Sequence, residues 1–358
     1  MNTKIVKISE DTPFAEAAKL HDAVKVIKSG GVVAFPTETV YGLGANGLDE
    51  SACAKIFEAK GRPSDNPLIL HISDISQLDT LVTEVSDTAK LLAENFWPGP
   101  MTLVLKRTSL VPSLVSGGLD TVAVRMPSNR IAHELIKQSG VPIAAPSANV
   151  SGRPSSTRAE HVETDLTGQV DMIIDGGSSV YGLESTIVDV SGNGKPCLLR
   201  PGSITVEQLE SVVGKIDIDP AVTAHMLSGE RPKAPGMAYV HYAPRAKLTV
   251  VTGNISSVRK KITELSQKQH AEGVDISNIA IITTNEGLEH YRNAPAKLFS
   301  LGKRSDLNEP AANLYDVLRS LDEAGITHAF AESFDETGIG LSIMNRMKKA
   351  AGYRILSV

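Results

Sequence analysis

The chain has 358 residues, 41% of them hydrophobic, with a formal net charge of −5 and a sequence pI of about 6.0. Because a globular domain usually holds about 100–200 residues, this length predicts two domains. The acidic balance argues against a wholesale nucleic-acid binder, which usually has a strongly basic face, and favours small-molecule partners. The first 30 residues contain no uninterrupted apolar run of the kind found in a signal peptide or a membrane span. We therefore expect a cytoplasmic protein.

The two cysteines, Cys53 and Cys197, lie far apart in the sequence, without a C-x-x-C spacing or a nearby histidine cluster. Neither a disulfide framework nor a zinc site is therefore expected, and buried free thiols are the simpler interpretation.

The first two thirds of the chain alternate helical and strand-like segments. Helical periodicity over residues 15–30 leads into the apolar run GVVAF, and further amphipathic helices are predicted at 51–60, 129–140 and 205–214. The strand-like runs between them are PLILHIS, MTLVLKR, TVAVRMP, VPIAAPSAN, DMIIDGG and ESTIVDV. This pattern predicts an α/β domain with a many-stranded sheet over residues 1–214.

A proline-punctuated segment without sustained periodicity follows, which predicts a long linker over residues 215–245. Unstructured connections of this length are uncommon unless they serve a function. From Leu248 onward strands and helices alternate again, which predicts a smaller α/β domain over residues 246–358.

The stretch GLGANG, residues 42–47, formally matches the G-x-G-x-x-G dinucleotide-binding fingerprint. That fingerprint needs its first glycine in the turn directly after a strand. Here the apolar run ends at Pro36, and the residues PTETVY intervene before Gly42. We therefore interpret the match as accidental and expect a hydroxyl-rich binding loop after a strand.

Several loops combine cations, hydroxyl groups and glycines. Such loops suit a polyphosphate, whose charge is met by charge-assisted hydrogen bonds and by backbone N–H groups. Three of them follow apolar segments, where α/β sheets form ligand crevices, and no Walker A motif is present. For any single residue, a solvated surface role is the alternative. The candidates are Lys60, Arg62, Ser64, Ser147, Asn149, Ser151, Arg153, Ser155 and Arg200.

Arg125 stands within the apolar strand TVAVRMP, where a guanidinium is costly unless it is paired. Its partner is either an internal Asp or Glu or a substrate carboxylate held by two hydrogen bonds, and both alternatives stay open. His71 near the end of a strand is a weaker candidate. No Ser-His-Asp order, G-x-S-x-G, H-E-x-x-H or paired-carboxylate pattern appears. The chemistry is therefore expected to rely on positioning and charge neutralisation, without a protein nucleophile.

Several further motifs follow one another along the chain. In order, they are PTETVYGLGA, K-G-R with NPL, FWPGPMTLVL, VAVRMP, PSAN-SG-P, GLESTIVD, LRPG and HYAP. Together they resemble the two-domain form of the YrdC-like threonylcarbamoyl-AMP synthases. The resemblance is dense over residues 20–205 and weaker over the second domain, which is similar to that family's C-terminal Rossmann-like module. It implies a YrdC-like twisted α/β sheet domain, a linker over the active site and a smaller Rossmann-like domain.

The resemblance also implies an ATP-binding nucleotidyltransferase, whose product donates the threonylcarbamoyl group of threonylcarbamoyladenosine in tRNA processing. L-threonine and bicarbonate form a carbamate, which attacks the α-phosphate of ATP and releases pyrophosphate. The ATP phosphates would carry Mg²⁺, with no metal held by the protein alone, and tRNA threonylcarbamoyl-transfer proteins would take the product. The residues implied to bind threonine are Thr37, His71, Arg125, Ala145 and Ser185. Those implied to bind ATP are Lys60, Arg62, Ser64, Thr121, Ser147, Asn149, Ser155, Arg200 and Tyr239.

The linker PGMAYVHYAP is expected to fold back over the first domain, with Tyr239 on the nucleotide and with His241 and Tyr242 anchoring the closed form. Ala238 and Val240 stand where many relatives carry basic residues, which puts any linker charge on the triphosphate in doubt. A non-catalytic RNA-binding YrdC-like module is the alternative function, and the net acidity argues against it. A hydrogenase-maturation type of carbamoyl chemistry is disfavoured because the cysteine clusters of its zinc fingers are missing.

Overall fold

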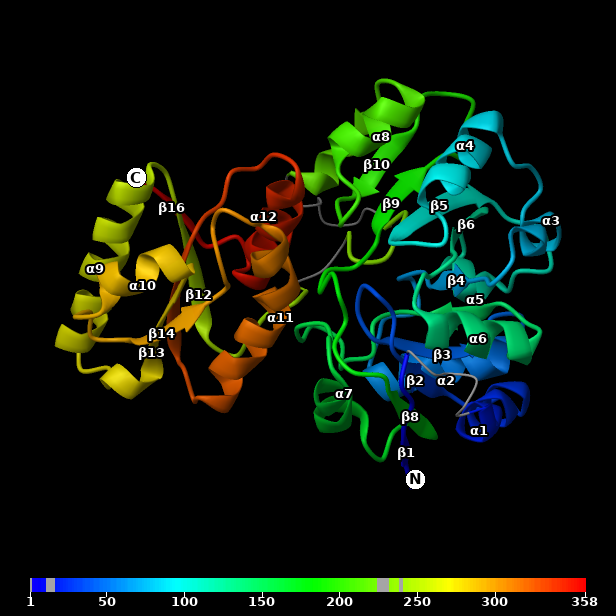
Figure 1. The fold of residues 1–358 in the computed structure, drawn as a ribbon, viewed down its shortest axis with the longest axis horizontal. Helices are drawn as coiled ribbons and strands as arrows, with labels where there is room; N and C mark the ends of the chain where they lie inside the picture. The colour runs from blue at the N-terminus through cyan, green and yellow to red at the C-terminus, as the bar shows by residue number, and fades with distance from the viewer. Residues whose placement is uncertain (1, 11–16, 224–231, 238–240) are drawn as a thin grey trace. The chain divides into compact units, whose positions relative to one another are not determined.

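The computed structural model describes residues 2–10, 17–223, 232–237 and 241–358. The chain forms two compact units (Figure 1). The first comprises Met1–Ser151 and Ser155–Tyr239, and the second comprises Gly152–Pro154 and Val240–Val358. The segment expected as a linker is thus divided between the units at residues 239 and 240, and its predicted limits of 215 and 245 stay a prediction.

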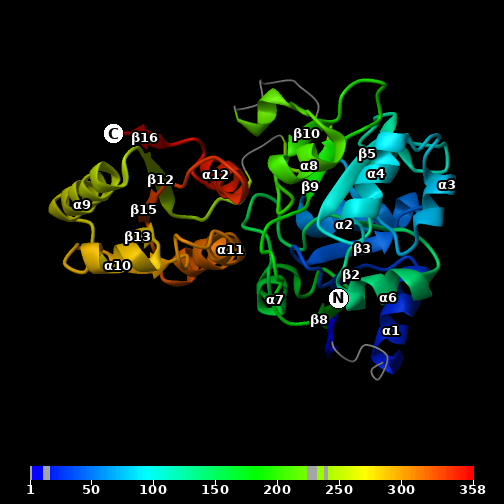
Figure 2. The same ribbon diagram turned by 45° about the horizontal axis from the view of Figure 1, so that its top comes forward.

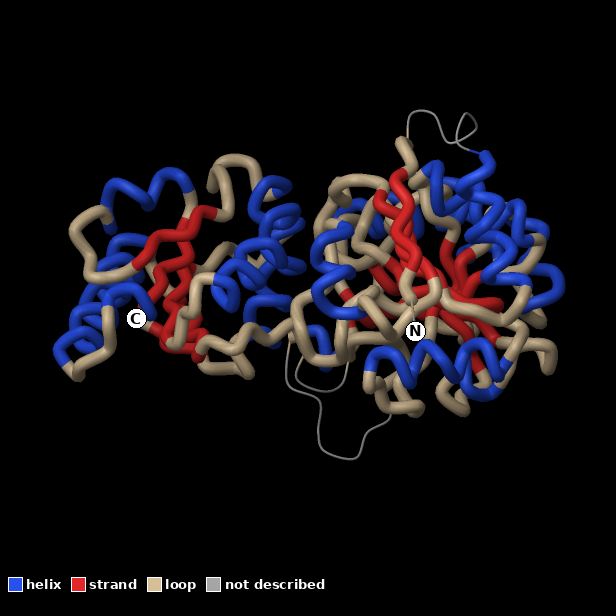
Figure 3. The backbone as a smooth tube through the Cα atoms, turned by 90° about the horizontal axis from the view of Figure 1, so that it is seen from below, coloured by secondary structure: helices blue, strands red, loops and turns tan. Residues whose placement is uncertain are grey.

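The first unit is built on a mixed sheet, with eleven strands among its described residues in the order β1-β8-β2-β3-β7-β4-β6-β5-β9-β10-β11. Figure 3 shows these strands as a twisted fan between layers of helices. The strands are β1 (Lys4–Lys7), β2 (Val33–Phe35), β3 (Gly42–Asn46), β4 (Ile69–His71), β5 (Met101–Lys106), β6 (Thr121–Arg125), β7 (Ile143–Ala145), β8 (Met172–Asp175), β9 (Thr186–Asp189), β10 (Cys197–Arg200) and β11 (Asp217–Ile218). The helices are α1 (Ala17–Lys28), α2 (Glu50–Lys60), α3 (Leu78–Leu81), α4 (Asp87–Phe96), α5 (Ser113–Ser116), α6 (Arg130–Ser139), α7 (Ala159–Leu166) and α8 (Val206–Val213). The expected α/β class is confirmed.

Helices cover the sheet of the first unit unequally. Alternate strand residues point to opposite faces, and on one face they join α2, α4, α7 and α8 in a single apolar core. On the other face α1 and α6 cover the strands from β1 to β7. The neighbouring strands β4, β6, β5, β9 and β10 have another cover there.

That cover comes from the segment predicted as linker. Ala221, Ala234 and Met237 are buried in one cluster with apolar side chains of β4, β5, β6, β9 and β10. The described parts of the linker therefore serve as the missing layer of the first unit.

Among its described residues, the second unit has a five-stranded sheet in the order β14-β13-β15-β12-β16, in which every pairing is parallel. Its elements are β12 (Lys247–Thr252), α9 (Ile255–Ala271), β13 (Ile279–Thr283), α10 (Asn285–Tyr291), β14 (Lys297–Ser300), α11 (Asn308–Glu323), β15 (His328–Glu332), α12 (Ile339–Ala350) and β16 (Ile355–Ser357). Figure 2 shows α9 and α10 on one face and α11 and α12 on the other. This arrangement confirms the expected smaller, Rossmann-like α/β domain.

Tyr242, at the start of the second unit, is buried and packs on the ring of Tyr315 at 5.2 Å between centroids. The guanidinium carbon of Arg346 lies 5.7 Å from the centre of the Tyr242 ring. Tyr242 therefore packs against α11 and α12 of its own unit. Its expected role in a closed linker stays a prediction.

The expected hydroxyl-rich loop after a strand is present at residues 36–41, and the glycine run that follows it forms a further strand. Gly42–Asn46 is β3, which pairs antiparallel with β2, and the turn between them is Pro36–Tyr41. A Cβ atom on Gly44 would lie 2.6 Å from both Ile143 Cγ2 and Phe35 Cε1. Close packing of the core therefore favours glycine at position 44, the central glycine of the accidental fingerprint.

We expect Gly44→Ala to lower the thermal stability of the first unit by about 1–3 kcal/mol, because the new methyl group overpacks a closed core. Gly194→Ala is the matched control, since a Cβ there meets no atom within 4 Å. Melting temperatures followed by circular dichroism measure both. Equal melting temperatures for the two variants would show that the core around β3 accommodates the added methyl group without loss of stability.

Candidate functional site

Strand alternation gathers polar side chains on the face of the first unit that the linker covers. Arg125, the last residue of β6, is paired with His71 of β4 on one side and with Thr102 of β5 on the other. The Thr102 hydroxyl lies 2.7 Å from the Ser185 hydroxyl, which directly precedes β9. Four of these strands therefore end in one cluster of polar side chains.

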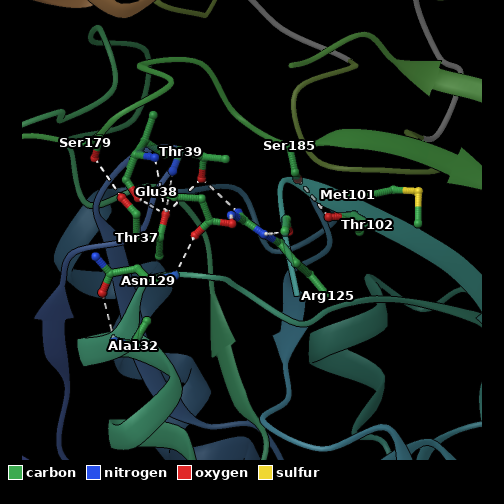
Figure 4. A network of polar contacts seen from close by, with 12 residues as sticks. Thr37, Glu38, Thr39, Met101, Thr102, Arg125, Asn129, Ala132, Ser179 and Ser185 are labelled. Atoms are coloured by element: carbon green, nitrogen blue, oxygen red, sulfur yellow. Dashed lines mark hydrogen bonds and ion pairs between the residues drawn. The ribbon is translucent and has the colours of Figure 1, made fainter. Parts of the chain in front are cut away.

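The guanidinium of Arg125 is buried, and its side chain is only 4% exposed. Figure 4 shows it pointing toward the turn between β2 and β3. Its NH2 nitrogen donates to Glu38 Oε1 at 2.5 Å, and its NH1 nitrogen donates to Thr39 Oγ1 at 2.8 Å. Its Nε donates to the Gly99 carbonyl at 3.2 Å. The internal carboxylate that was one of the two open alternatives is thus present.

Sequence reasoning missed Glu38 as a residue of the site. Its second carboxylate oxygen accepts a hydrogen bond from the backbone N–H of Asn129 at 3.4 Å, next to the start of α6. Burial acts to raise the pKa of Glu38, but the charge and hydrogen bond of Arg125 outweigh it, so this pKa lies below its usual value. Glu38 is therefore ionised at neutral pH. A lone acidic residue between the two threonines of PTETVY was the available signal.

The threonines on either side of Glu38 are linked to each other. The Thr37 hydroxyl donates to the Val40 carbonyl at 2.6 Å and lies 2.8 Å from the Thr39 hydroxyl. Ser179 donates to the Thr37 carbonyl at 2.9 Å, as Figure 4 shows. Thr37 was expected at the site, and its hydroxyl lies within hydrogen-bond distance of the Thr39 hydroxyl that Arg125 contacts.

His71 is buried and packs its ring against the ring of Phe35, with centroids 6.1 Å apart. Its Nδ1 lies 3.1 Å from the Ile69 carbonyl, which fits an Nδ1–H donor. Burial, reinforced by the positive charge of Arg125, lowers the pKa of His71 to about 3. The imidazole is therefore neutral at physiological pH and unsuited to act as a general acid.

A second cluster lies around Arg200, at the end of β10. Its Nε donates to the Ser185 carbonyl at 3.1 Å, and its NH2 donates to the Ser185 hydroxyl at the same distance. Its NH1 donates to the carbonyl of Pro235 in the linker at 2.9 Å. Arg200 thus joins the linker to the cluster that contains Ser185 and Thr102.

Lys60 ends α2, and Gly61 follows with φ 59°, a left-handed conformation typical of a glycine that ends a helix. Lys60 was expected in a cationic loop, with a solvated surface role as the alternative, but it lies in a helix and is only 2% exposed. Its Nζ donates to the Ser147 carbonyl at 2.5 Å and to the Asn149 carbonyl. The lysine thus holds the loop that follows β7 against the end of α2.

The other residues expected to bind the nucleotide are more dispersed. Arg62 donates to the Asn66 and Pro67 carbonyls of its own loop. Ser155 is buried and donates to Glu184 Oε1 at 2.5 Å. Ser64 is exposed, and Thr121 begins β6, about 13 Å along the strand from Arg125 at about 3.3 Å per residue. Tyr239 lies outside the described residues.

The structure therefore brings together most of the residues expected for threonine. Thr37, Arg125, His71 and Ser185 are linked by the contacts described above, and Ala145 of β7 pairs with Ile69 of β4. Of the residues expected for ATP, the contacts join Lys60 to the Ser147–Asn149 loop and Arg200 to Ser185.

Candidates for other chemistry are weak. Burial, with nearby Asp49 and Glu50, raises the pKa of Cys53 to about 12, so this thiol does not ionise at neutral pH. Within the described residues, no group of three His, Cys, Asp or Glu side chains could hold a metal ion. Nor does any helix in the described part of the chain have the length and apolar character needed to cross a membrane.

We expect His71 to lower the free energy of unfolding as the pH becomes acidic. Below about pH 6.5 the unfolded chain protonates this histidine while the folded chain does not, so stability falls as the pH falls toward 3. The loss is at most about 1.4 kcal/mol per pH unit. Urea unfolding at pH 7, 6 and 5 should show a shallower pH dependence for His71→Gln than for the wild type.

His21→Gln serves as the control for this experiment, because His21 is exposed on α1. An unchanged pH dependence in His71→Gln would mean that His71 takes up a proton in the folded protein.

Comparison with known proteins follows the same division of the chain. Residues 25–202 match the family described as Telomere recombination, Sua5_yciO_yrdC, and residues 204–352 match the one described as Threonylcarbamoyl-AMP synthase, C-terminal domain. The threonylcarbamoyl-AMP synthase of Pyrococcus abyssi is 49% identical over 96% of this chain and 97% of its own. That of Bacillus subtilis is 48% identical over 97% of this chain and 95% of its own.

A solved structure is similar over the full length. The crystal structure of P. abyssi Sua5 complexed with L-threonine has a TM-score of 0.90 and 47% identity, and the match covers all of both chains. Both the sequence and the fold agree with the resemblance carried by the motifs. The chain therefore belongs to the threonylcarbamoyl-AMP synthase family, in its two-domain form with a Sua5 C-terminal domain.

Proposed function

We propose that the chain joins L-threonine, bicarbonate and ATP into threonylcarbamoyl-AMP, with release of pyrophosphate and water. The threonine amine first adds to bicarbonate to give a carbamate and water. A carbamate oxygen then attacks the α-phosphorus of ATP, and the bond to the β-phosphate oxygen breaks. The product would serve tRNA modification through a separate transferase. Relatives named threonylcarbamoyl-AMP synthase over nearly the full chain support this proposal.

The observation that carries the proposal is the arrangement of Arg125. A guanidinium has five N–H donors. Within the described residues, Arg125 uses three of them, on Gly99, Thr39 and Glu38, which leaves one N–H on each terminal nitrogen. A carboxylate accepts two such hydrogen bonds side by side. The two alternatives for Arg125 are thus compatible, because the arginine pairs with Glu38 and still has donors for the carboxylate of threonine.

Around this carboxylate site, Thr37, His71, Ala145 and Ser185 would complete the contacts to threonine. His71 would act as a neutral hydrogen-bonding group, since its proton affinity is low. Small side chains such as those of Ala145 and Ser185 leave room for a ligand of threonine's size.

The cationic groups on the neighbouring loops would bind the nucleotide. We assign Lys60, Arg62, Ser64, Thr121, Ser147, Asn149, Ser155, Arg200 and Tyr239 to ATP, as the resemblance implies. Lys60 would act mainly through the loop that it holds, because its ammonium already donates to two backbone carbonyls. Mg²⁺ would arrive with ATP, held chiefly by the phosphate oxygens.

Catalysis in this arrangement depends on placement and charge neutralisation. The protein would hold the carbamate oxygen in line with the leaving pyrophosphate and offset the developing negative charge. The linker would exclude water, because a mixed anhydride hydrolyses readily. Its buried residues Ala234 and Met237, and the carbonyl of Pro235 on Arg200, support this position.

Pyrophosphate release tests the reaction directly. We expect release only when ATP, L-threonine and bicarbonate are all present, and little release when another amino acid replaces threonine. A chain that releases none under any of these conditions, yet binds RNA, would be the non-catalytic alternative.

We expect Arg125→Lys to weaken threonine binding by about tenfold or more, because a lysine cannot form the paired hydrogen bonds of a guanidinium. ATP binding should change far less, since the assigned nucleotide residues lie elsewhere. Titration calorimetry with each substrate measures both affinities. An equal loss of affinity for threonine and for ATP would show that Arg125 does not bind the carboxylate of threonine.

Lys60→Met should reduce both turnover and thermal stability. The substitution keeps the buried stem but removes hydrogen bonds from a charged donor, each worth about 1.5–3 kcal/mol. Lys90→Met is the control, because Lys90 is exposed on α4. A Lys60→Met variant with a normal melting temperature and lost activity would show instead that the ammonium acts on the phosphates.

A further inference from the structure

We propose that Glu38 is a positioning residue of the substrate site: it orients Arg125 and keeps this arginine selective for an amino-acid carboxylate over phosphate. The inference rests on the proposed function, in which Arg125 holds the carboxylate of threonine. It assigns a role to a residue that would not itself touch the substrate.

The contact between Glu38 and Arg125 joins distant parts of the sheet. Glu38 follows β2 and Arg125 ends β6, and three strands, β3, β7 and β4, lie between β2 and β6 in the sheet. The NH2 of Arg125 nevertheless lies 2.5 Å from Glu38 Oε1, with both side chains almost fully buried. The turn that carries Glu38 therefore reaches across the ends of the intervening strands to the guanidinium.

Glu38 is itself held in place at both its backbone and its side chain. Its carbonyl accepts a hydrogen bond from the N–H of Tyr181 at 2.8 Å, and its Oε2 accepts one from the N–H of Asn129 at 3.4 Å. A carboxylate fixed in this way defines the direction of the guanidinium that it contacts. Together with Thr39 and the Gly99 carbonyl, it restrains Arg125 through three hydrogen bonds, one from each guanidinium nitrogen.

The charge of Glu38 also affects which anions Arg125 attracts. Burial of an uncompensated guanidinium is costly, and such a group attracts any anion strongly. The proposed reaction brings a triphosphate into the same unit of the protein, so a bare Arg125 would compete for phosphate groups. With Glu38 ionised, the buried pair has no net charge. It therefore suits threonine, whose ammonium and carboxylate also cancel, better than it suits phosphate.

Steady-state kinetics of pyrophosphate release by the full chain test this inference with Glu38→Gln, which keeps the shape of the side chain and removes its charge. We expect the KM for threonine to rise about tenfold or more, because one partner of a buried pair is altered. The KM for ATP should stay within about twofold. Inorganic phosphate should inhibit Glu38→Gln competitively against threonine at concentrations that leave the wild type unaffected.

Two further variants separate the role from a general structural one. Glu38→Asp keeps the charge, so it should retain the wild type's indifference to phosphate even if its KM for threonine rises. Thr39→Val removes a contact of Arg125 without changing charge, so its KM for threonine should rise without any new inhibition by phosphate. Glu94→Gln, an exposed position on α4, is the control and should behave as the wild type.

The outcomes also separate this inference from the proposed function. If Arg125→Lys weakens threonine binding while Glu38→Gln raises both KM values equally, or gains no sensitivity to phosphate, Glu38 is a structural residue and the inference is wrong. If Glu38→Gln does not fold, the test rests on Glu38→Asp and Thr39→Val. Inhibition of either variant by phosphate would overturn the inference about Glu38. An unchanged KM for threonine in both variants would overturn it as well. If Arg125→Lys leaves threonine binding intact, the proposed carboxylate site itself fails.

Discussion

The cost of burying one guanidinium governs the arrangement of the candidate site. Arg125 ends a strand whose other residues are apolar, and its side chain is almost fully removed from water. Such a charge is tolerated only with a compensating charge and with hydrogen bonds to its donors. The turn between β2 and β3 provides Glu38 and Thr39, and the backbone at Gly99 provides a carbonyl. The hydrogen bonds of one side chain therefore tie two separate loops to the end of β6.

Lys60 and Arg62 are also compensated by hydrogen bonds, in their case to backbone carbonyls. Lys60 donates to carbonyls of the loop after β7, and Arg62 donates to carbonyls of its own loop. Cations that shape their surroundings in this way are set before any substrate arrives, which reduces the reorganisation needed on binding. The candidate site thus combines a buried ion pair with cationic side chains that hold the backbone of neighbouring loops.

Much of the fold could be predicted because apolar runs bounded by turn residues mark buried strands. The runs containing Val33, Ile69, Val104, Val124 and Ile187 all form strands of the first unit. β3 was missed because its glycines are poor strand formers, and only the packing of Phe35 and Ile143 explains them. The strand arginine was identified from its apolar neighbours, but its partner was not, since Glu38 lies 87 residues earlier in the sequence. Lys60 was misjudged because only the tertiary structure shows which carbonyls its side chain reaches.

The unequal covering of the sheet has a consequence for local opening of the first unit. Where α1 and α6 lie on the sheet, uncovering it would require whole helices to separate from a large apolar core. Over β4, β6 and β5 the cover comes from the linker, whose described residues place Ala221, Ala234 and Met237 in the apolar cluster. Local opening is easiest where the fewest apolar contacts must be broken. By the contacts of the described residues, local opening of this face of the first unit is therefore easier on the linker side than under α1 and α6.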